Sequence, residues 1–274
     1  MKNNSIRKIV ILLMKKLINH AHISFICILI SHGDMLREAR ILSGIPGLDE
    51  LIRGGFPKRS VTLISGGPGS GKTIFALQML ISGAEKFDEA GVYATLTETP
   101  EELRLDASSF GWNIESLEKT GRLAILDLRP SRFLELKSEG RTDSFFSWVW
   151  KNIRLKAEET EAKRIAIDSL NVLSAYFSDE HQFRQKIMSL IEALHKFPEC
   201  ISLLLFEQIT LERTIEEFLT DGVIILHYIP VKNGMLRAIQ ILKMRRTEHS
   251  EYFHPLNITR EGIRIDPEET VALF

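Results

Sequence analysis

The chain has 274 residues, enough for one large α/β domain or two small ones. Its hydrophobic fraction of 44% can form a sizeable core, and its formal net charge of −1 gives no overall attraction to nucleic acid or to an anionic membrane. Cys27 and Cys200 fit no metal-binding spacing, so we expect two reduced thiols in a cytoplasmic protein.

Residues 1–34 differ in composition from the rest of the chain. Apolar side chains dominate 9–30, but two adjacent lysines interrupt the run, and a membrane span needs about 20 mostly apolar residues. No small-x-small cleavage site follows, as a signal peptide would require. A membrane-associated helix, a loosely packed extension and a translation start at Met35 all remain open. We expect the folded domain to cover 35–274.

After a Gly- and Pro-rich turn and a short helix expected at 48–52, Ser60–Thr73 reads SVTLISGGPGSGKT. Its second half fits the pattern G-x-x-x-x-G-K-[ST], and it lies between a β-rich run and an apolar helix that reaches about Lys86. This strand, loop and helix order is typical of a phosphate-binding loop, whereas an ordinary Gly-rich turn would not need it. Glycines allow the backbone to curl round an anion, and the helix start offers free N–H groups.

We expect this loop to bind ATP, with the Lys72 ammonium at the β- and γ-phosphates and the Thr73 hydroxyl on Mg²⁺. The loop residues expected to contact the nucleotide are Gly66, Gly67, Pro68, Gly69, Ser70, Gly71, Lys72, Thr73 and Ile74.

The later elements alternate at first and then change character. Apolar patterning predicts strands at 91–97, 123–128, 164–168, 201–206, 222–228, 235–244 and 263–265, and helices at 100–110 and 179–195. Arg129–Arg141 is predicted to be an exposed loop. Asp143 is predicted to cap a helix whose apolar face is Phe146, Val149, Trp150 and Ile153. Strands alternate with helices early and cluster late, so we predict an α/β fold whose mostly parallel sheet has an antiparallel C-terminal extension.

Two carboxylates are expected beside the phosphate loop, since ligands of open α/β sheets bind outside the carboxyl ends of the strands. Asp168 ends a strand there and could hold Mg²⁺ or orient its water, although it could also merely cap the Ser169 turn. Glu98 follows another strand and could act as the general base for hydrolysis.

Lys243 and Arg245 are two residues apart and therefore share a face of their strand; Thr247 and His249 continue the alternation if the strand extends. This edge either faces solvent or meets an anion, such as the γ-phosphate bound by a neighbouring subunit. Spacing alone does not decide between the two.

Together these residues resemble the KaiC-like branch of the RecA/RadA ATPase superfamily. The resemblance runs from about Ile41 to Asp266 and rests on four segments in order. These are SGIPGLDEL at 43–51, ETP at 98–100 with SFGW at 109–112, IEEFLTDGV at 215–223, and KMR at 243–245 with the closing strands near Thr259 and Gly262.

The resemblance implies a RecA-like fold and a homo-oligomeric ring, usually a hexamer, with ATP at each subunit boundary. One subunit would give the phosphate loop, Asp168 and Glu98, with Ser109 near the nucleotide. Its neighbour would give the second group of contacts, which are Lys243, Met244, Arg245, Thr247, His249 and Thr259.

One position departs from the family pattern of two adjacent glutamates, because Thr97 occupies the first. If the side chain at position 97 is the one that faces the attacking water, the site lacks its base and would bind ATP but hydrolyse it slowly or not at all. If the chain bends after Leu96, Glu98 could reach that water instead. We therefore expect a weak ATPase that assembles into a ring. The alternatives are an ATP-gated signalling scaffold for an unknown protein partner and a RadA-type DNA strand-exchange enzyme. The 129–141 segment mixes basic and acidic residues, which makes nucleic acid an unlikely partner.

Overall fold

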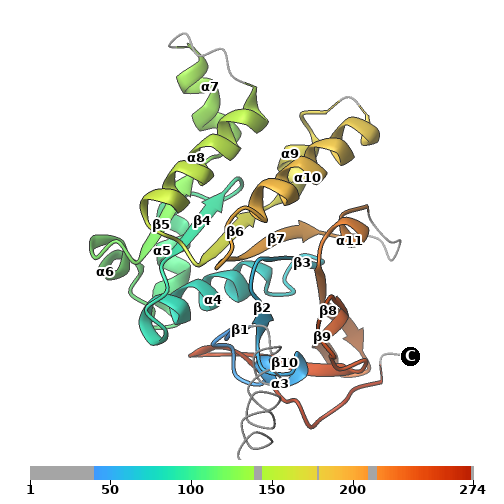
Figure 1. Ribbon diagram of the computed structural model, residues 1–274. Helices are drawn as coiled ribbons and strands as arrows, with labels where there is room; N and C mark the ends of the chain where they lie inside the picture. The colour runs from blue at the N-terminus through green and yellow to red at the C-terminus, as the bar shows by residue number, and fades with distance from the viewer. Residues whose placement is uncertain (1–39, 139–143, 178, 209–214, 273–274) are drawn as a thin grey trace, which may run out of the picture. The chain divides into compact units, whose positions relative to one another are not determined.

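The computed structural model describes residues 40–138, 144–177, 179–208 and 215–272. Within these residues a nine-stranded sheet has the order β11-β10-β9-β8-β3-β7-β6-β4-β5 (Figure 1). The strands of this sheet are β3 (Ser60–Gly66), β4 (Gly91–Thr95), β5 (Leu123–Asp127), β6 (Arg164–Asp168), β7 (Ile201–Glu207), β8 (Gly222–Val231), β9 (Gly234–Met244), β10 (Phe253–Thr259) and β11 (Gly262–Ile265). The short strands β1 (Arg40–Ile41) and β2 (Phe56–Pro57) form a separate antiparallel pair.

The direction of the strands changes once along the sheet. Every pairing from β8 through β3, β7, β6 and β4 to β5 is parallel, whereas the β8–β9, β9–β10 and β10–β11 pairings are antiparallel. The predicted α/β sheet with its antiparallel C-terminal extension is confirmed. Because parallel strands point the same way, the carboxyl ends of β3, β4, β6 and β7 lie at one edge of the sheet.

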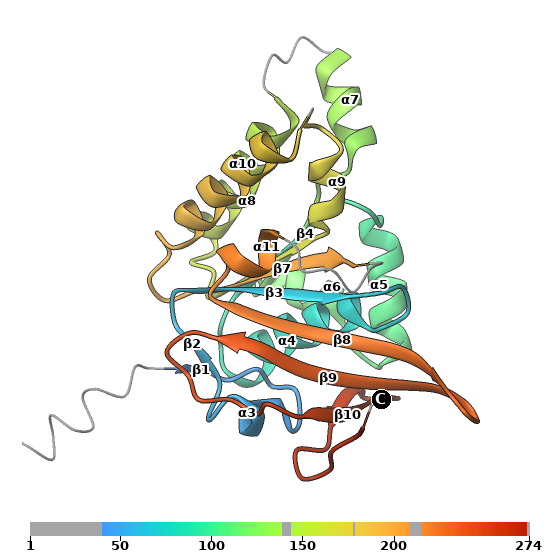
Figure 2. The ribbon, with the colours of Figure 1, turned by 90° about the vertical axis from the view of Figure 1, so that its right-hand side faces the viewer.

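Helices cover both faces of the sheet, and Figure 2 shows α4 on one side of the strands and α8 and α10 on the other. The helices are α3 (Leu48–Leu51), α4 (Lys72–Lys86), α5 (Pro100–Ser109), α6 (Ile114–Lys119), α7 (Pro130–Ser138), α8 (Phe145–Glu159), α9 (Leu170–Ser174), α10 (Glu180–Leu194) and α11 (Ile215–Leu219). No helix among the described residues is both apolar and long enough to span a bilayer.

Two hydrophobic clusters lie on opposite faces of the sheet because strand side chains alternate. Ile64 and Tyr93 belong to the cluster on the α4 face, whereas Leu63 and Val92 belong to the cluster under α8 and α10. Cys200 is buried in the second cluster, and burial raises the pKa of its thiol to about 12. Both faces of the sheet are therefore packed against helices, which gives the carboxyl ends of the strands a rigid support.

The predicted loop at Arg129–Arg141 is wrong, because α7 covers most of that segment. Pro130 occupies the first helical position, where its missing N–H costs nothing, and Phe133 packs into the second cluster. The first turns also carry an Arg132–Glu135 ion pair. Residues 139–143 lie outside the described part of the chain.

Two further predictions about the later elements need correction. Ser144 caps α8 by accepting a hydrogen bond from the Ser147 amide, and Asp143, which was predicted to do so, lies outside the described residues. Strand β10 was not predicted from its apolar pattern. It contains Pro255, which has no amide hydrogen to donate, and pairs with β9 only over Phe253–Pro255 before it pairs with β11.

A buried arginine joins the segment before the phosphate loop to the sheet. The guanidinium of Arg164 is fully buried and donates to the carbonyls of Leu42 and Met79, each at 2.7 Å, and to the Glu89 carboxylate. A Cβ at Gly83 of α4 would lie 2.3 Å from Nε of Arg164, so the arginine fits only because that helical position is glycine.

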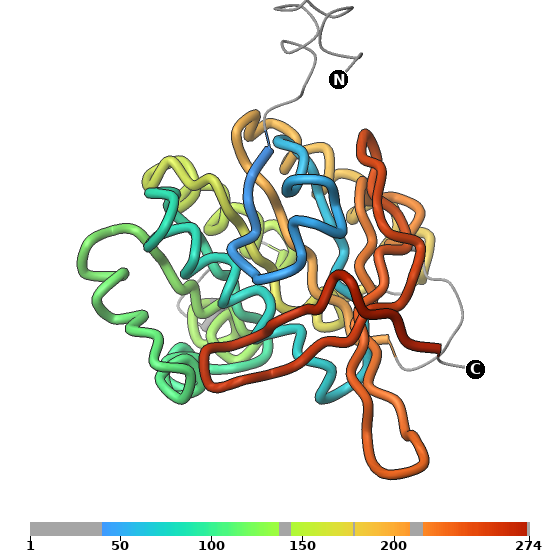
Figure 3. The backbone as a smooth tube through the Cα atoms, turned by 90° about the horizontal axis from the view of Figure 1, so that it is seen from below, coloured from blue at the N-terminus to red at the C-terminus, as the bar shows by residue number. Residues whose placement is uncertain are grey.

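The segment before the phosphate loop also packs against the C-terminal strands, and both lie on the side of the domain seen in Figure 3. The Ile265 amide donates to the Pro46 carbonyl at 2.9 Å. Gly47, with φ +83°, allows this contact because a Cβ there would lie 2.1 Å from the Ile265 carbonyl oxygen. The segments near the two ends of the family resemblance are therefore in direct contact.

Candidate nucleotide-binding site

The phosphate loop joins the carboxyl end of β3 to the start of α4. A Cβ at Gly66 would lie 2.4 Å from the Leu226 carbonyl oxygen and 2.7 Å from the Ser70 hydroxyl, so only glycine fits. Gly71, with φ +102°, precedes α4, and no side chain caps the helix start. The first amides of α4 are therefore available to an anion, as a triphosphate site requires.

Lys72 is folded back onto this loop. Its ammonium donates to the carbonyls of Gly66 at 2.9 Å and Gly67 at 3.0 Å. Burial lowers the pKa of Lys72, and the negative charges of Glu207 and Asp168 partly oppose that shift. The Lys72 ammonium is thus bound to neutral carbonyl groups of the same loop that is predicted to bind the phosphates.

Asp168 accepts two hydrogen bonds on a single oxygen. Thr73 Oγ1 donates to Oδ2 at 2.9 Å, and the Tyr93 hydroxyl donates to the same atom at 2.6 Å. Burial raises the pKa of Asp168, and these two hydrogen bonds oppose that effect. Burial also raises the pKa of Tyr93 well above its ordinary value, so the phenol remains a donor. The structure therefore brings the two predicted metal ligands, Thr73 and Asp168, into direct contact.

Glu98 lies where the chain turns after β4. Thr95 Oγ1 donates to the Glu98 carbonyl at 2.7 Å and accepts from the Glu98 amide at 3.1 Å, which closes the turn. Oε2 of Glu98 is buried and has no hydrogen-bond partner among the described residues. Burial raises the pKa of Glu98, and the charge of Asp168 adds to the increase. Thr97, by contrast, is exposed.

The residues predicted to serve a neighbouring subunit are only partly on the strand. β9 ends at Met244, so Arg245 lies just beyond the strand, and the alternation does not extend to Thr247 and His249. Thr247 instead accepts from the Arg40 guanidinium at 3.0 Å, and His249 Nδ1 lies 3.0 Å from the Ser250 carbonyl oxygen.

Lys243 and Arg245 are oriented by the segment that joins α11 to β8. The Lys243 ammonium donates to the carbonyls of Glu217, Phe218 and Thr220. Nη1 of Arg245 lies 3.6 Å from Oδ1 of buried Asp221, while its side chain is 55% exposed. The Arg245 guanidinium is therefore accessible from solvent. Lys243 would have to break its three hydrogen bonds to carbonyls before it could bind another ligand.

Thr259 lies near the phosphate loop, whereas Ser109 is an exposed residue at the end of α5 for which the structure shows only a local contact. Thr259 lies on the β10–β11 hairpin beside Ile258, whose Cδ1 would be 3.3 Å from a Cβ on Gly71 of the same chain's loop. Ser109 ends α5, and its hydroxyl donates to the Asp106 carbonyl. Thr259 was predicted to contact the nucleotide of a neighbouring subunit. Its hairpin, however, packs beside the phosphate loop of its own chain.

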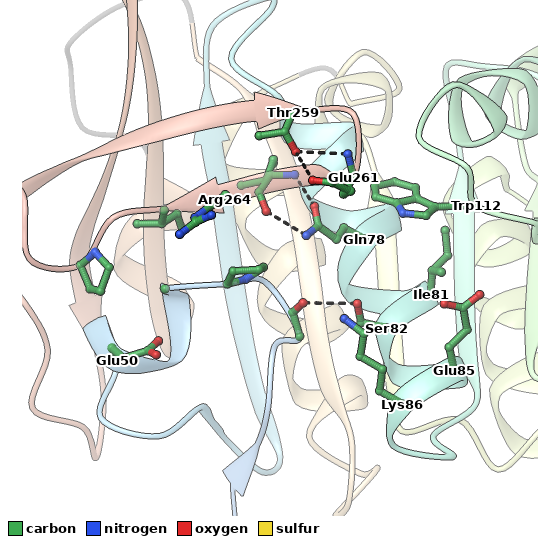
Figure 4. A pocket seen from close by; sticks show the side chains of 16 residues that line it. Glu50, Gln78, Ile81, Ser82, Glu85, Lys86, Trp112, Thr259, Glu261 and Arg264 are labelled. Atoms are coloured by element: carbon green, nitrogen blue, oxygen red, sulfur yellow. Dashed lines mark hydrogen bonds between the residues drawn. The ribbon is translucent and has the colours of Figure 1, made fainter.

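A cavity of about 430 Å³ runs from this hairpin along α4 (Figure 4). Thr259, Glu261 and Trp112 lie at one end, and the Gln78 amide group closes the floor through two hydrogen bonds with the Ile263 backbone. The cavity lies along the helix flank and contains neither Lys72 nor Asp168, so it is separate from the phosphate loop.

The residues at the loop suit a magnesium nucleotide. Open amides, the Lys72 ammonium and a Ser70 hydroxyl that is buried without a partner among the described residues provide donors to phosphate. Thr73 and Asp168 provide the hard oxygen ligands that Mg²⁺ prefers.

Sequence reasoning missed several residues near the loop. Glu207 ends β7, so the argument that found Asp168 applied to it equally. Asn171 pairs its amide group with the Glu207 backbone at 2.7 and 2.9 Å, and Arg237 donates to the Gly69 carbonyl at 3.0 Å. These contacts and the Tyr93 hydrogen bond depend on how distant elements pack and pair, which no local pattern reveals.

Comparison with known proteins gives a consistent result. The model of the KaiC ATPase family matches residues 41–270. A UPF0273 protein of Methanopyrus kandleri is 37% identical over 240 residues, which cover 84% of this chain and 93% of that protein. The circadian clock oscillator protein KaiC of Parathermosynechococcus lividus is 34% identical over 82% of this chain, which spans only 42% of that protein.

Among solved structures, a KaiC-like protein from Pyrococcus horikoshii superimposes with a TM-score of 0.72 at 36% identity. The match covers 84% of this chain and 99% of that one. The phosphate loop, the sheet topology and these matches lead to one conclusion: the chain belongs to the KaiC family of ATPase domains.

Proposed function

We propose that this protein binds ATP with Mg²⁺ at Gly66–Thr73 and hydrolyses it slowly. The observation that carries the proposal is the convergence of Lys72, Thr73 and Asp168 at the carboxyl edge of the sheet, with Thr73 and Asp168 in contact at 2.9 Å. Bound Mg²⁺ would neutralise charge on the phosphates. Thr73 and Asp168 would hold it, and Lys72 would exchange its loop carbonyls for phosphate oxygens.

Glu98 is the proposed general base. Its buried Oε2, unpartnered among the described residues, supports this role, since a catalytic base needs an acceptor that no protein donor occupies. Glu98 could replace the missing first glutamate if the chain bends after Leu96, and the turn between Thr95 and Glu98 supports such a bend. Thr97, in contrast to the buried Glu98 Oε2, is exposed to solvent, which does not support a role for it at the attacking water.

We further propose a ring in which Arg245 of one subunit completes the site of the next. Its exposed guanidinium, held near Asp221, supports a role toward an outside anion. Lys243 would join it only by releasing the carbonyls of α11. The position of Thr259 beside its own loop supports a contribution within one subunit instead.

The two alternatives make different demands on the structure. A DNA strand-exchange enzyme would need free basic residues near 129–141, but in the described part of that segment Arg129 pairs with Asp127 and Arg132 with Glu135. A scaffold with little turnover is favoured by Thr97 and would assemble on ATP without hydrolysing it.

The test combines ATP affinity, phosphate release and particle size with and without ATP, on the full chain and on Lys72→Ala. We expect ATP to bind, phosphate to be released slowly, and the variant to lose affinity. Unchanged affinity in Lys72→Ala would refute the site. Assembly without phosphate release would favour the scaffold.

A further inference from the structure

Among the described residues, Tyr93 is a side-chain donor to Asp168 that the proposed function leaves without a role. Tyr93 has no exposed surface, and its ring lies in the core cluster on the α4 face. Its hydroxyl donates to Oδ2 of Asp168 at 2.6 Å. A hydrogen bond to a carboxylate is stronger than a neutral one, and leaving a buried hydroxyl without a partner costs free energy. The contact therefore constrains both groups.

Strand register explains how the phenol reaches this carboxylate. Tyr93 of β4 is paired with Ala166 of β6, and Asp168 lies two residues further along β6. Side chains two residues apart on a strand share a face, and a diagonal neighbour is within reach of an aromatic side chain. The small Ala166 side chain opposite Tyr93 leaves space for the ring.

The two donors to Asp168 act on the same oxygen. Thr73 Oγ1 and the Tyr93 hydroxyl both donate to Oδ2, while no side chain among the described residues donates to Oδ1. With one oxygen fixed from two directions, rotation of the carboxylate is restricted. The other oxygen keeps its acceptor capacity.

We propose that Tyr93 is a positioning residue of the nucleotide site, whose hydroxyl holds Oδ2 of Asp168 so that Oδ1 stays free to hold Mg²⁺, directly or through a water of its shell. The proposal rests on the proposed function, because it assigns Asp168 to the metal. It extends that function to a core residue which touches neither nucleotide nor metal. Tyr93 would therefore act only through Asp168.

The test uses Tyr93→Phe, which removes one oxygen and keeps the ring, with Tyr252→Phe as control because Tyr252 is 67% exposed. ATP affinity is measured with Mg²⁺ and with EDTA. We expect Tyr93→Phe to leave the affinity in EDTA unchanged and to raise the Mg²⁺ concentration needed for half-maximal enhancement about tenfold. The control should match the wild type in both conditions.

A double-mutant cycle with Asp168→Asn separates positioning from packing. If Tyr93 acts through Asp168, adding Tyr93→Phe to Asp168→Asn should change the Mg²⁺ dependence by less than about twofold. An equal loss of affinity with and without Mg²⁺, or an unchanged Mg²⁺ dependence in the single variant, would overturn the inference and leave ATP binding intact. A wild-type protein that binds no ATP would instead overturn the proposed function, and the inference with it.

Discussion

The substitution Glu98→Gln should have opposite effects on turnover and on stability. It replaces a carboxylate whose Oε2 is buried and unpartnered among the described residues with a neutral amide of the same size. Loss of a general base lowers turnover by about a hundredfold to ten-thousandfold. Removing an unpaired buried charge should raise the free energy of unfolding of the nucleotide-free protein by about 1 kcal/mol. For a domain of this size that is a rise in Tm of about 2–4 °C.

The sign of the stability effect follows from the raised pKa of Glu98. The folded state holds the proton more tightly than the unfolded state, so stability falls as the pH rises from the ordinary glutamate range through the raised pKa. The whole penalty is present above the raised pKa, where Glu98 is charged in the folded state, and Glu98→Gln removes it. The gain should shrink as the pH is lowered toward the ordinary range.

The assays are phosphate release and thermal unfolding across this pH range. Glu101→Gln is the matched control, because it makes the same change three residues away on a side chain that is 74% exposed. Normal turnover in Glu98→Gln would show that the base lies elsewhere. A loss of stability would contradict the inferred burial of an unpartnered charge.

Three further substitutions test separate parts of the account. Arg245→Ala should keep ATP affinity and lower turnover about a thousandfold, measured by phosphate release; full turnover would remove Arg245 from the reaction. Gly83→Ala should lower the free energy of unfolding in urea by about 2–4 kcal/mol, because its Cβ would lie 2.3 Å from Arg164 Nε. An unchanged value would contradict that packing. Thr97→Glu restores the family's paired glutamates at an exposed position and should leave turnover almost unchanged; a large increase would identify position 97 as the site of the base.

Local signals in the sequence were sufficient for much of the fold. Helix α10 agrees with the predicted 179–195 to within one residue at each end, and Asp179 caps it, because cap and periodicity are encoded within the helix itself. The strand end at Asp168 was equally clear, since the apolar run stops there at a residue with evident chemistry. The family resemblance implied a RecA-like fold, and the observed sheet confirms the α/β assignment.

What sequence could not supply depends on distant partners. Pro130 suggested a loop but starts α7, because Phe133 gains burial against the second cluster. Tyr93 looked like an ordinary strand aromatic, and only the β4–β6 register brings its hydroxyl to Asp168. Lys243 looked available on its strand, yet it holds the carbonyls at the end of α11. Each difference comes from a tertiary contact.

A mixing experiment tests the shared ATP site most directly. Lys72→Ala and Arg245→Ala should each be nearly inactive alone, because one lacks the phosphate-loop cation and the other the arginine offered to the neighbour. In a randomly mixed ring, half of the loops and half of the arginines are intact, so about one quarter of the boundaries combine both (½ × ½). We therefore predict that mixing restores about a quarter of the wild-type phosphate release. No recovery from variants shown to assemble together would contradict a site shared between subunits.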